Sequence, residues 1–393
     1  MDTIQRITEN NIREIFGISK THGFLSETPT PQSIRKPYDV FFNIATNLSE
    51  LIKNHQIQNL VDNLPLINID STTTHEEHGM LYSMLCLIQA GYIWHNGEGW
   101  HNKAVPKQIA IPLNQVSNYF GIPPLLTHLA VDLVNWRKID PTGPFDLENV
   151  TTPITVTADP SESHFYKVMI VIEYYGANIL NAIIDLMYGK ISVVDALETI
   201  DETLNKFIET IEQMRKGCDP DFFYNTLRIF LTGWTNETLF PEGMTLEGID
   251  TNVKWSGGSA AQSSIIQVLD IFLGVTHQNG FLKEMRNYMP SKHREFLTWL
   301  EAQPNCRVFL TDQSKDLYNQ CIGKLSKFRS IHMGLIHTYI LSKAATSKSA
   351  IAKEGTGGTE LAKSNNACEQ PSESGLVVML KEFRKETDDQ KIN

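Results

Sequence analysis

The stretch that decides the fold runs from residue 317 to residue 339 and reads LYNQCIGKLSKFRSIHMGLIHTY. Its apolar side chains recur at alternating steps of four and three residues, a spacing that places them on one face of an α-helix. His332 falls on this face, whereas His337 lies five residues further on, about 140° around the helix. One interpretation is a core histidine that hydrogen-bonds to a carbonyl group. The alternative is a haem site, because a porphyrin needs apolar walls and its iron a neutral nitrogen ligand.

Helical periodicity also dominates the rest of the chain. Between Leu197 and Met214, apolar residues recur at helical spacing over about five turns. Asp219 and Pro220 are typical of a helix start, with the aspartate as N-cap and the proline in the first helical position. Runs of β-branched residues are short, and the clearest is ITVTA at 154–158. A mainly α-helical protein is therefore predicted.

Composition excludes several classes of protein. The chain of 393 residues has 34 Lys and Arg against 45 Asp and Glu, so its net charge of −11 disfavours nucleic acid as a partner. No apolar run approaches the roughly 20 residues of a membrane helix, and the first residues lack the pattern of a secretory signal. The five cysteines are scattered without CxxC spacing, so neither a disulfide framework nor a thiolate zinc site is expected. A cytoplasmic protein fits these features.

Two irregular stretches divide the chain. The turn-rich residues 140–163 predict a boundary between a smaller N-terminal domain, residues 1–156, and a larger domain, residues 157–393. Residues from about 345 to 375 are poor in apolar side chains and rich in Ser, Gly and Lys, so a mobile loop is expected there. The segment LVVMLKEFRK after this loop can form a short terminal helix.

Charged residues inside apolar helices are candidates for function. Asp270 follows the loop SGGSAAQSS (256–264), which is no phosphate loop because neither a GK[ST] motif nor a preceding strand is present. A buried carboxylate requires a partner, and Arg329 is a candidate. Arg228 lies in the apolar run FYNTLRIFL, where a guanidinium is either paired structurally or available for a ligand carboxylate.

Other motifs carry weaker signals. THEEH (74–78) lacks the HExxH pattern of metalloproteases and is interpreted as the solvated start of a helix. GTGGTE (355–360) lacks the GxGxxG pattern and follows no predicted strand, so it is not a dinucleotide loop.

Taken together, several segments resemble the indoleamine 2,3-dioxygenases. They stand in the order and spacing of that family and extend over nearly the whole chain. The segments are IAIPLNQVSNYFGIPPLLTH (109–128), FYNTLRIFLTGW (223–234), SGGSAAQSS, MPSKHREFLTWLEAQP (289–304), FRSIHMGLIHTYI (328–340) and EGTGGTE (354–360).

The resemblance implies a two-domain helical protein with haem b in the larger C-terminal domain, beneath the smaller N-terminal domain. It implies insertion of both atoms of dioxygen across the indole C2–C3 bond of L-tryptophan. The product would be N-formylkynurenine, at the entry to the kynurenine pathway and to NAD synthesis. Ferrous iron, an unidentified reductant and a monomeric state are part of this expectation. The alternative is a haem protein that binds or senses oxygen, although retention of Arg228 and Phe223 favours the enzyme.

The resemblance also assigns residues to roles. His332 corresponds to the proximal iron ligand, and Asp270 and Arg329 to a buried ion pair beside it. Arg228 corresponds to the residue that receives the substrate carboxylate. The remaining pocket residues that the resemblance implies, for the substrate, the distal side of the haem and a closing loop, are Phe165, Phe223, Gly258, Ser259, Ala260 and Thr356. Of these, Ser259 is expected to be a catalytic residue that places its hydroxyl near a haem propionate and the substrate.

Two positions depart from the family's usual pattern. His128 stands where relatives often have tyrosine, and it is expected to accept the indole N–H or to offer a second iron ligand. Met169 stands where some relatives have a serine. Loss of that serine is compatible with activity if dioxygen and indole react without a protein base.

Overall fold

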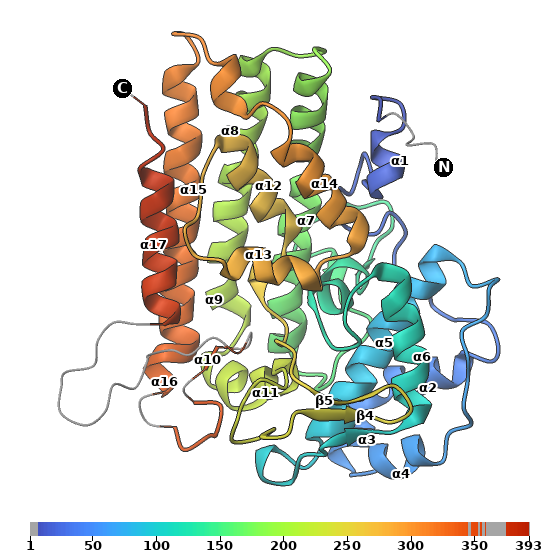
Figure 1. Ribbon diagram of the computed structural model, residues 1–393. Coiled ribbons are helices and arrows are strands. Elements are labelled where there is room, and N and C mark those ends of the chain that lie inside the picture. The colour runs from blue at the N-terminus through green and yellow to red at the C-terminus, as the bar shows by residue number, and fades with distance from the viewer. Residues whose placement is uncertain (1–6, 345–346, 353, 356–357, 359–374, 393) are drawn as a thin grey trace, which may run out of the picture.

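The computed structural model describes residues 7–344, 347–352, 354–355, 358 and 375–392. This part of the chain is mainly helical, which confirms the predicted fold class (Figure 1). The N-terminal half contains α1 (Ile12–Phe16), α2 (Asp39–Thr46), α3 (Leu48–Lys53), α4 (Ile57–Asp62), α5 (His75–Trp94), η1 (Glu98–Trp100), α6 (Lys107–Phe120) and η2 (Leu129–Leu133).

The C-terminal half is built around long helices that run side by side, among them α7, α8, α15 and α17 (Figure 1). Its helices are α7 (Pro160–Met187), α8 (Val193–Glu212), α9 (Met214–Gly217), α10 (Pro220–Phe222), η3 (Phe223–Leu227), α11 (Arg228–Leu231), η4 (Ala260–Gln262), α12 (Ser264–Leu273), α13 (Phe281–Met285), η5 (Arg286–Tyr288), α14 (Ser291–Glu301), η6 (Cys306–Phe309), α15 (Lys315–Ile336), η7 (His337–Leu341), α16 (Ser342–Ala344) and α17 (Leu376–Asp388).

Local sequence explains where several helices begin. Asp219 accepts a hydrogen bond from the backbone of Phe222 with Pro220 in the first turn, as predicted. Thr74 and Glu77 form a capping box at the start of α5, so THEEH does begin a helix. His78, however, is buried and stacks on Tyr119 at 3.9 Å between ring centroids, so this residue is not solvated as expected.

The strands are short. β1 (Ala104–Val105) pairs in parallel with β4 (Met244–Leu246), which pairs antiparallel with β5 (Asp250–Val253), and β2 (Arg137–Lys138) pairs with β3 (Val150–Thr151). The β-branched run at 154–158 forms no strand. Its backbone N–H groups at Val156 and Thr157 instead donate to the buried carboxylate of Glu162.

Helix α7 is long and apolar enough, by length and composition, to cross a bilayer. Charged residues interrupt this stretch, so it does not stand out in the sequence as a continuous apolar run. Two-thirds of its most apolar window, 67 %, is buried inside the protein. It packs against α8 and α12, as the core helix of a globular protein does.

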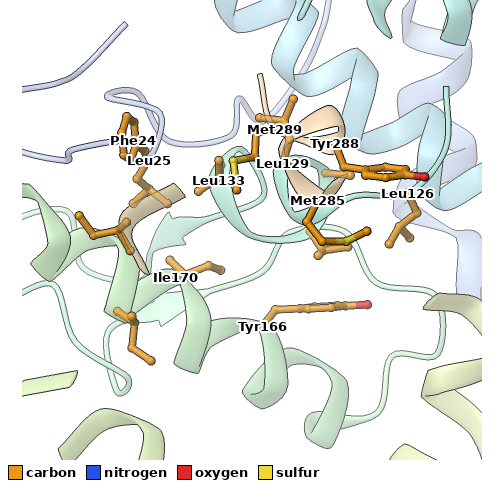
Figure 2. Packing of buried hydrophobic residues seen from close by; sticks show 14 of the residues in the cluster. Phe24, Leu25, Leu126, Leu129, Leu133, Tyr166, Ile170, Met285, Tyr288 and Met289 are labelled. Atoms are coloured by element: carbon orange, nitrogen blue, oxygen red, sulfur yellow. The ribbon is translucent and has the colours of Figure 1, made fainter. Parts of the chain in front are cut away.

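The two halves share one hydrophobic core. Figure 2 shows part of their contact, where Leu126, Leu129 and Leu133 from the N-terminal half lie near Tyr166 and Ile170 of α7. The turn-rich stretch 140–163 holds β3 and leads into α7 at Pro160. The division into domains at residue 156 stays a prediction.

Candidate functional site

A large cavity lies between the long helices of the C-terminal half and the loop that follows β5. Its volume is about 240 Å³. A void that holds one water molecule needs only about 10–15 Å³, so this cavity is many times larger than a single water site. Native interiors contain few voids larger than one water molecule, so a space of this size indicates a large ligand. Its walls are mostly apolar and include Phe165, Met169, Ile266, Phe328, Leu335 and Leu380.

Three π-helical segments contribute to the cavity wall. η2 provides Val131 and Asp132, η3 provides Phe223, and η7 provides Tyr339 and Ile340. A π-helical turn inserts one extra residue into a helix and is frequent at functional sites. Periodicity at 3.6 residues per turn does not reveal such turns, and the sequence analysis did not predict them.

His332 lies on α15 and lines the cavity, whereas His337 is exposed. No hydrogen bond joins the His332 ring to another residue in the described part of the chain, so the carbonyl partner of a core histidine is missing there. Burial and the neighbouring Arg329 lower the pKa of His332 to about 4, which keeps the imidazole neutral. A neutral imidazole in the wall of an apolar cavity fits the needs of haem iron.

Asp270 and Arg329 form the ion pair that the sequence suggested. The Arg329 Nη2 atom donates to both carboxylate oxygens of Asp270, at 2.6 and 2.7 Å. Burial alone would raise the pKa of Asp270, but Arg329 and His277 lower it below its usual value. His277 bridges Asp270, at 3.1 Å, to Glu386 of α17, at 2.6 Å. No sequence pattern predicts this bridge, which ties the last helix, α17, to Asp270 of α12.

Arg228 is fully buried and makes no ion pair among the described residues. Its Nη2 atom donates to the carbonyl oxygens of Ile351, at 2.7 Å, and Glu354, at 2.6 Å. Among the described residues, Nε and Nη1 of Arg228 have no hydrogen-bond partner, and the guanidinium lies 4.5 Å from the centroid of the Tyr224 ring. A buried guanidinium with two such nitrogens is expensive unless an anion accepts hydrogen bonds from it. Arg228 is not itself a cavity-lining residue, although Phe223 and Leu231 on either side of it are.

Aromatic rings form a slot in the cavity. The ring of Phe223 lies 5.0 Å from that of Phe165 and 5.6 Å from that of Tyr339, measured between centroids. All three rings line the cavity, as does Met169 one turn along from Phe165. Flat apolar ligands pack well against such rings.

The loop after β5 forms another wall. Gly258, Ser259 and Ala260 all line the cavity. The Ser259 hydroxyl accepts a hydrogen bond from the backbone of Ala261 at 3.2 Å and so caps η4. Thr356 lies outside the described residues, but Gly355 next to it lines the cavity.

His128 also lines the cavity, but both its ring nitrogens are engaged. Nδ1 lies 2.6 Å from Asp132 and Nε2 lies 2.9 Å from Glu173. Ser263 donates to the same Glu173 oxygen at 2.5 Å. In this arrangement neither nitrogen can accept an indole N–H or bind iron. Those roles stay predictions, and the geometry favours a structural ion cluster instead.

This cluster predicts a pH dependence of stability. Burial favours the neutral His128 ring, but Asp132 and Glu173 outweigh it and raise the pKa from 6.5 to about 10. Because the folded pKa exceeds the unfolded value, the stabilisation is complete below about pH 6.5 and is lost as pH rises through about 10. We expect the urea midpoint of the wild type to fall over this range. The midpoint of His128→Gln should fall less, and equal slopes for both proteins would contradict this assignment.

Comparisons with known proteins agree with the geometry. The family model described as "Indoleamine 2,3-dioxygenase" matches residues 12–390. Indoleamine 2,3-dioxygenase 2 of Mus musculus is 33 % identical over 368 residues, covering 88 % of this chain and 91 % of that protein. Indoleamine 2,3-dioxygenase of Saccharomyces cerevisiae is 32 % identical over 365 residues, covering 84 % and 80 %. A helical fold with such a cavity and these relatives defines a haem-dependent dioxygenase.

A relative with a different name is also similar to the chain. Myoglobin of Haliotis madaka is 27 % identical over 389 residues and covers 95 % of this chain and 97 % of that protein. The family model nevertheless spans nearly all of the sequence. The chain belongs to the indoleamine 2,3-dioxygenase family.

Proposed function

We propose that the protein inserts both atoms of dioxygen across the C2–C3 bond of L-tryptophan and forms N-formylkynurenine. The buried Arg228 guanidinium carries this proposal, because Nε and Nη1 lack a partner among the described residues and an α-carboxylate would supply an acceptor. The names of the relatives, indoleamine 2,3-dioxygenases, support an indole substrate. We place the reaction in the cytoplasm, as the first step of the kynurenine pathway and of NAD synthesis from tryptophan.

His332 would hold haem b through a ring nitrogen, in a protein that acts as a monomer. Ferrous haem supplies the binding and activation of dioxygen. The chain's own residues orient the substrate. Arg228 binds the carboxylate, and Phe165 and Phe223 hold the indole plane in an apolar slot that excludes water. An external reductant keeps the iron ferrous.

Oxygen-18 labelling tests this reaction. Haem-loaded protein is incubated with L-tryptophan, a reductant and labelled dioxygen, and the product is analysed by mass spectrometry. We expect N-formylkynurenine that carries both labelled atoms. A product with one labelled atom, or none from a protein that binds haem and dioxygen, would refute the proposal.

The second candidate is a haem protein that binds oxygen without turnover. The similarity to Myoglobin of Haliotis madaka favours it. Such a protein has no need of an unpaired buried guanidinium, so Arg228 argues for the enzyme. A stable oxygen complex that persists in the presence of L-tryptophan would instead support the second candidate.

Arg228→Ala should impair turnover of L-tryptophan while the haem spectrum stays nearly unchanged. A hydrogen bond to a charged group contributes about 1.5–3 kcal/mol. The ratio kcat/KM should therefore fall by roughly ten- to a hundredfold. Arg228→Lys keeps the charge but lacks the planar guanidinium, so its kcat/KM should lie between those of the wild type and the alanine variant. Unchanged kcat and KM in the alanine variant would remove Arg228 from the substrate site.

A further inference from the structure

A short segment of the chain connects Arg228 with the N-terminal half. We define the strap as Ser349–Ala352 together with Glu354 and Gly355. Ile351 and Ala352 are buried, and Gly355 lines the cavity. These residues fall in the stretch for which the sequence predicted mobility, yet this part is packed against the protein. The strap therefore has a defined position between two charged side chains.

The carboxylate of Glu98 in η1 binds one side of the strap. One oxygen of its carboxylate accepts a hydrogen bond from the Ser349 hydroxyl, and the other accepts from the backbone N–H of Ala350 at 2.9 Å. Two bonds from one carboxylate to consecutive residues fix both the position and the direction of the backbone there. Glu98 is only partly exposed, so water competes less for these bonds than at an open surface.

The guanidinium of Arg228 binds the other side of the strap. The carbonyl of Ile351, one residue after Ala350, accepts from Arg228 Nη2, as does the carbonyl of Glu354. Both hydrogens of Nη2 are thereby used. The planar guanidinium is then fixed in its plane, and among the described residues its Nη1 and Nε atoms have no hydrogen-bond partner. The direction of their N–H groups depends on where the strap holds its carbonyl groups.

We propose that Glu98 is a positioning residue for substrate recognition. It holds the strap so that the carbonyls of Ile351 and Glu354 orient the Arg228 guanidinium toward the substrate carboxylate. The inference rests on the proposed function, since it requires that Arg228 binds this carboxylate. It extends the site to a residue of the N-terminal half that touches neither substrate nor haem.

The test compares two ligands that differ in one group. Tryptamine is tryptophan without its carboxylate, so Arg228 cannot orient it. Haem-loaded full-length protein is titrated with each ligand, and binding is followed by the shift of the haem absorption band. Glu98→Gln keeps the size of the side chain but turns an amide donor toward one of the two strap donors. We expect the Kd for L-tryptophan to rise about three- to tenfold and the Kd for tryptamine to stay unchanged.

Two further variants sharpen the test. Ser349→Ala removes one of the two hydrogen bonds to Glu98. Its Kd for L-tryptophan should rise less than that of Glu98→Gln, and its Kd for tryptamine should stay unchanged. Glu237→Gln is the matched control, because Glu237 is an exposed glutamate whose side chain pairs with Lys254 at 2.8 Å. This control should bind both ligands as the wild type does.

The outcomes separate the inference from the proposed function. A wild type that binds L-tryptophan no better than tryptamine would refute the role of Arg228, and the inference with it. A wild type that prefers L-tryptophan, with the same preference in Glu98→Gln, would overturn the inference alone. Equal weakening of both ligands in Glu98→Gln would also overturn it, because that result indicates general damage to the cavity.

Discussion

His332→Ala is expected to abolish stable haem binding while the helical fold persists. The His332 imidazole lines the cavity, and its pKa is lowered to about 4. It is therefore a neutral ligand at physiological pH. Without it, the apolar walls alone would hold the porphyrin, and the iron would lose its axial nitrogen. Titration of the apoprotein with haem measures the effect through the Soret band, and far-UV circular dichroism reports the fold.

His337→Ala is the matched control for this experiment. The residue lies on the continuation of the same helix and is exposed, so its removal should leave haem binding intact. A full Soret band in His332→Ala would show that another residue binds the iron. His128 also lines the cavity, but it could bind iron only if it left Asp132 or Glu173, and a double variant would test this.

The position of His332 could be predicted because it depends on local rules. Steps of three and four residues place a side chain on one face of a helix, and the structure contains that helix as α15 followed by η7. The Asp270–Arg329 pair could be suggested for a related reason. A charge on an apolar helix face needs a partner, and few candidates were available.

The ion cluster around His128 could not be predicted in this way, because its partner Glu173 lies 45 residues away. The contact between Glu98 and Ser349, 251 residues apart, could not be predicted either. Periodicity describes which way a side chain points from its own helix, and contacts over such separations depend on how helices pack. The two interpretations of Arg228 illustrate this limit, because the structure combines them. One nitrogen is paired with carbonyl groups, and the other two have no partner in the part of the chain that the structure describes.

The contacts of α17 show how the haem-ligand helix is held in place. α17 lines the cavity through Met379 and Phe383. Thr387 of α17 accepts a hydrogen bond from Arg329, and Ser326 of α15 donates to Asp388 at 2.9 Å. With the bridge from His277 to Glu386, these bonds fix α17 against α15 on the side of the ion pair. Asp270 is the carboxylate that both Arg329 and His277 share, so its removal should weaken the contact of α17 with α15.

Asp270→Ala is therefore expected to destabilise the haem-free protein by about 3–5 kcal/mol, because it leaves the buried charge of Arg329 unpaired. The midpoint of urea unfolding measures this loss. Since the folded pKa of Asp270 lies below 3.8, the stabilisation is present above that pH and is lost as pH falls through the folded pKa. Neutral pH therefore shows the full effect.

Two comparisons identify the cause. Asp201→Ala removes another ion pair of α15, with Lys324 at 2.6 Å, but both partners are partly exposed. That variant should lose only about 1 kcal/mol or less. Leucine at both Asp270 and Arg329 removes the charges together and should recover much of the stability, since apolar side chains can replace a buried pair at little cost. If Asp270→Ala lost no more than Asp201→Ala, the pair would not anchor the haem-ligand helix, and α17 would be held by its apolar contacts alone.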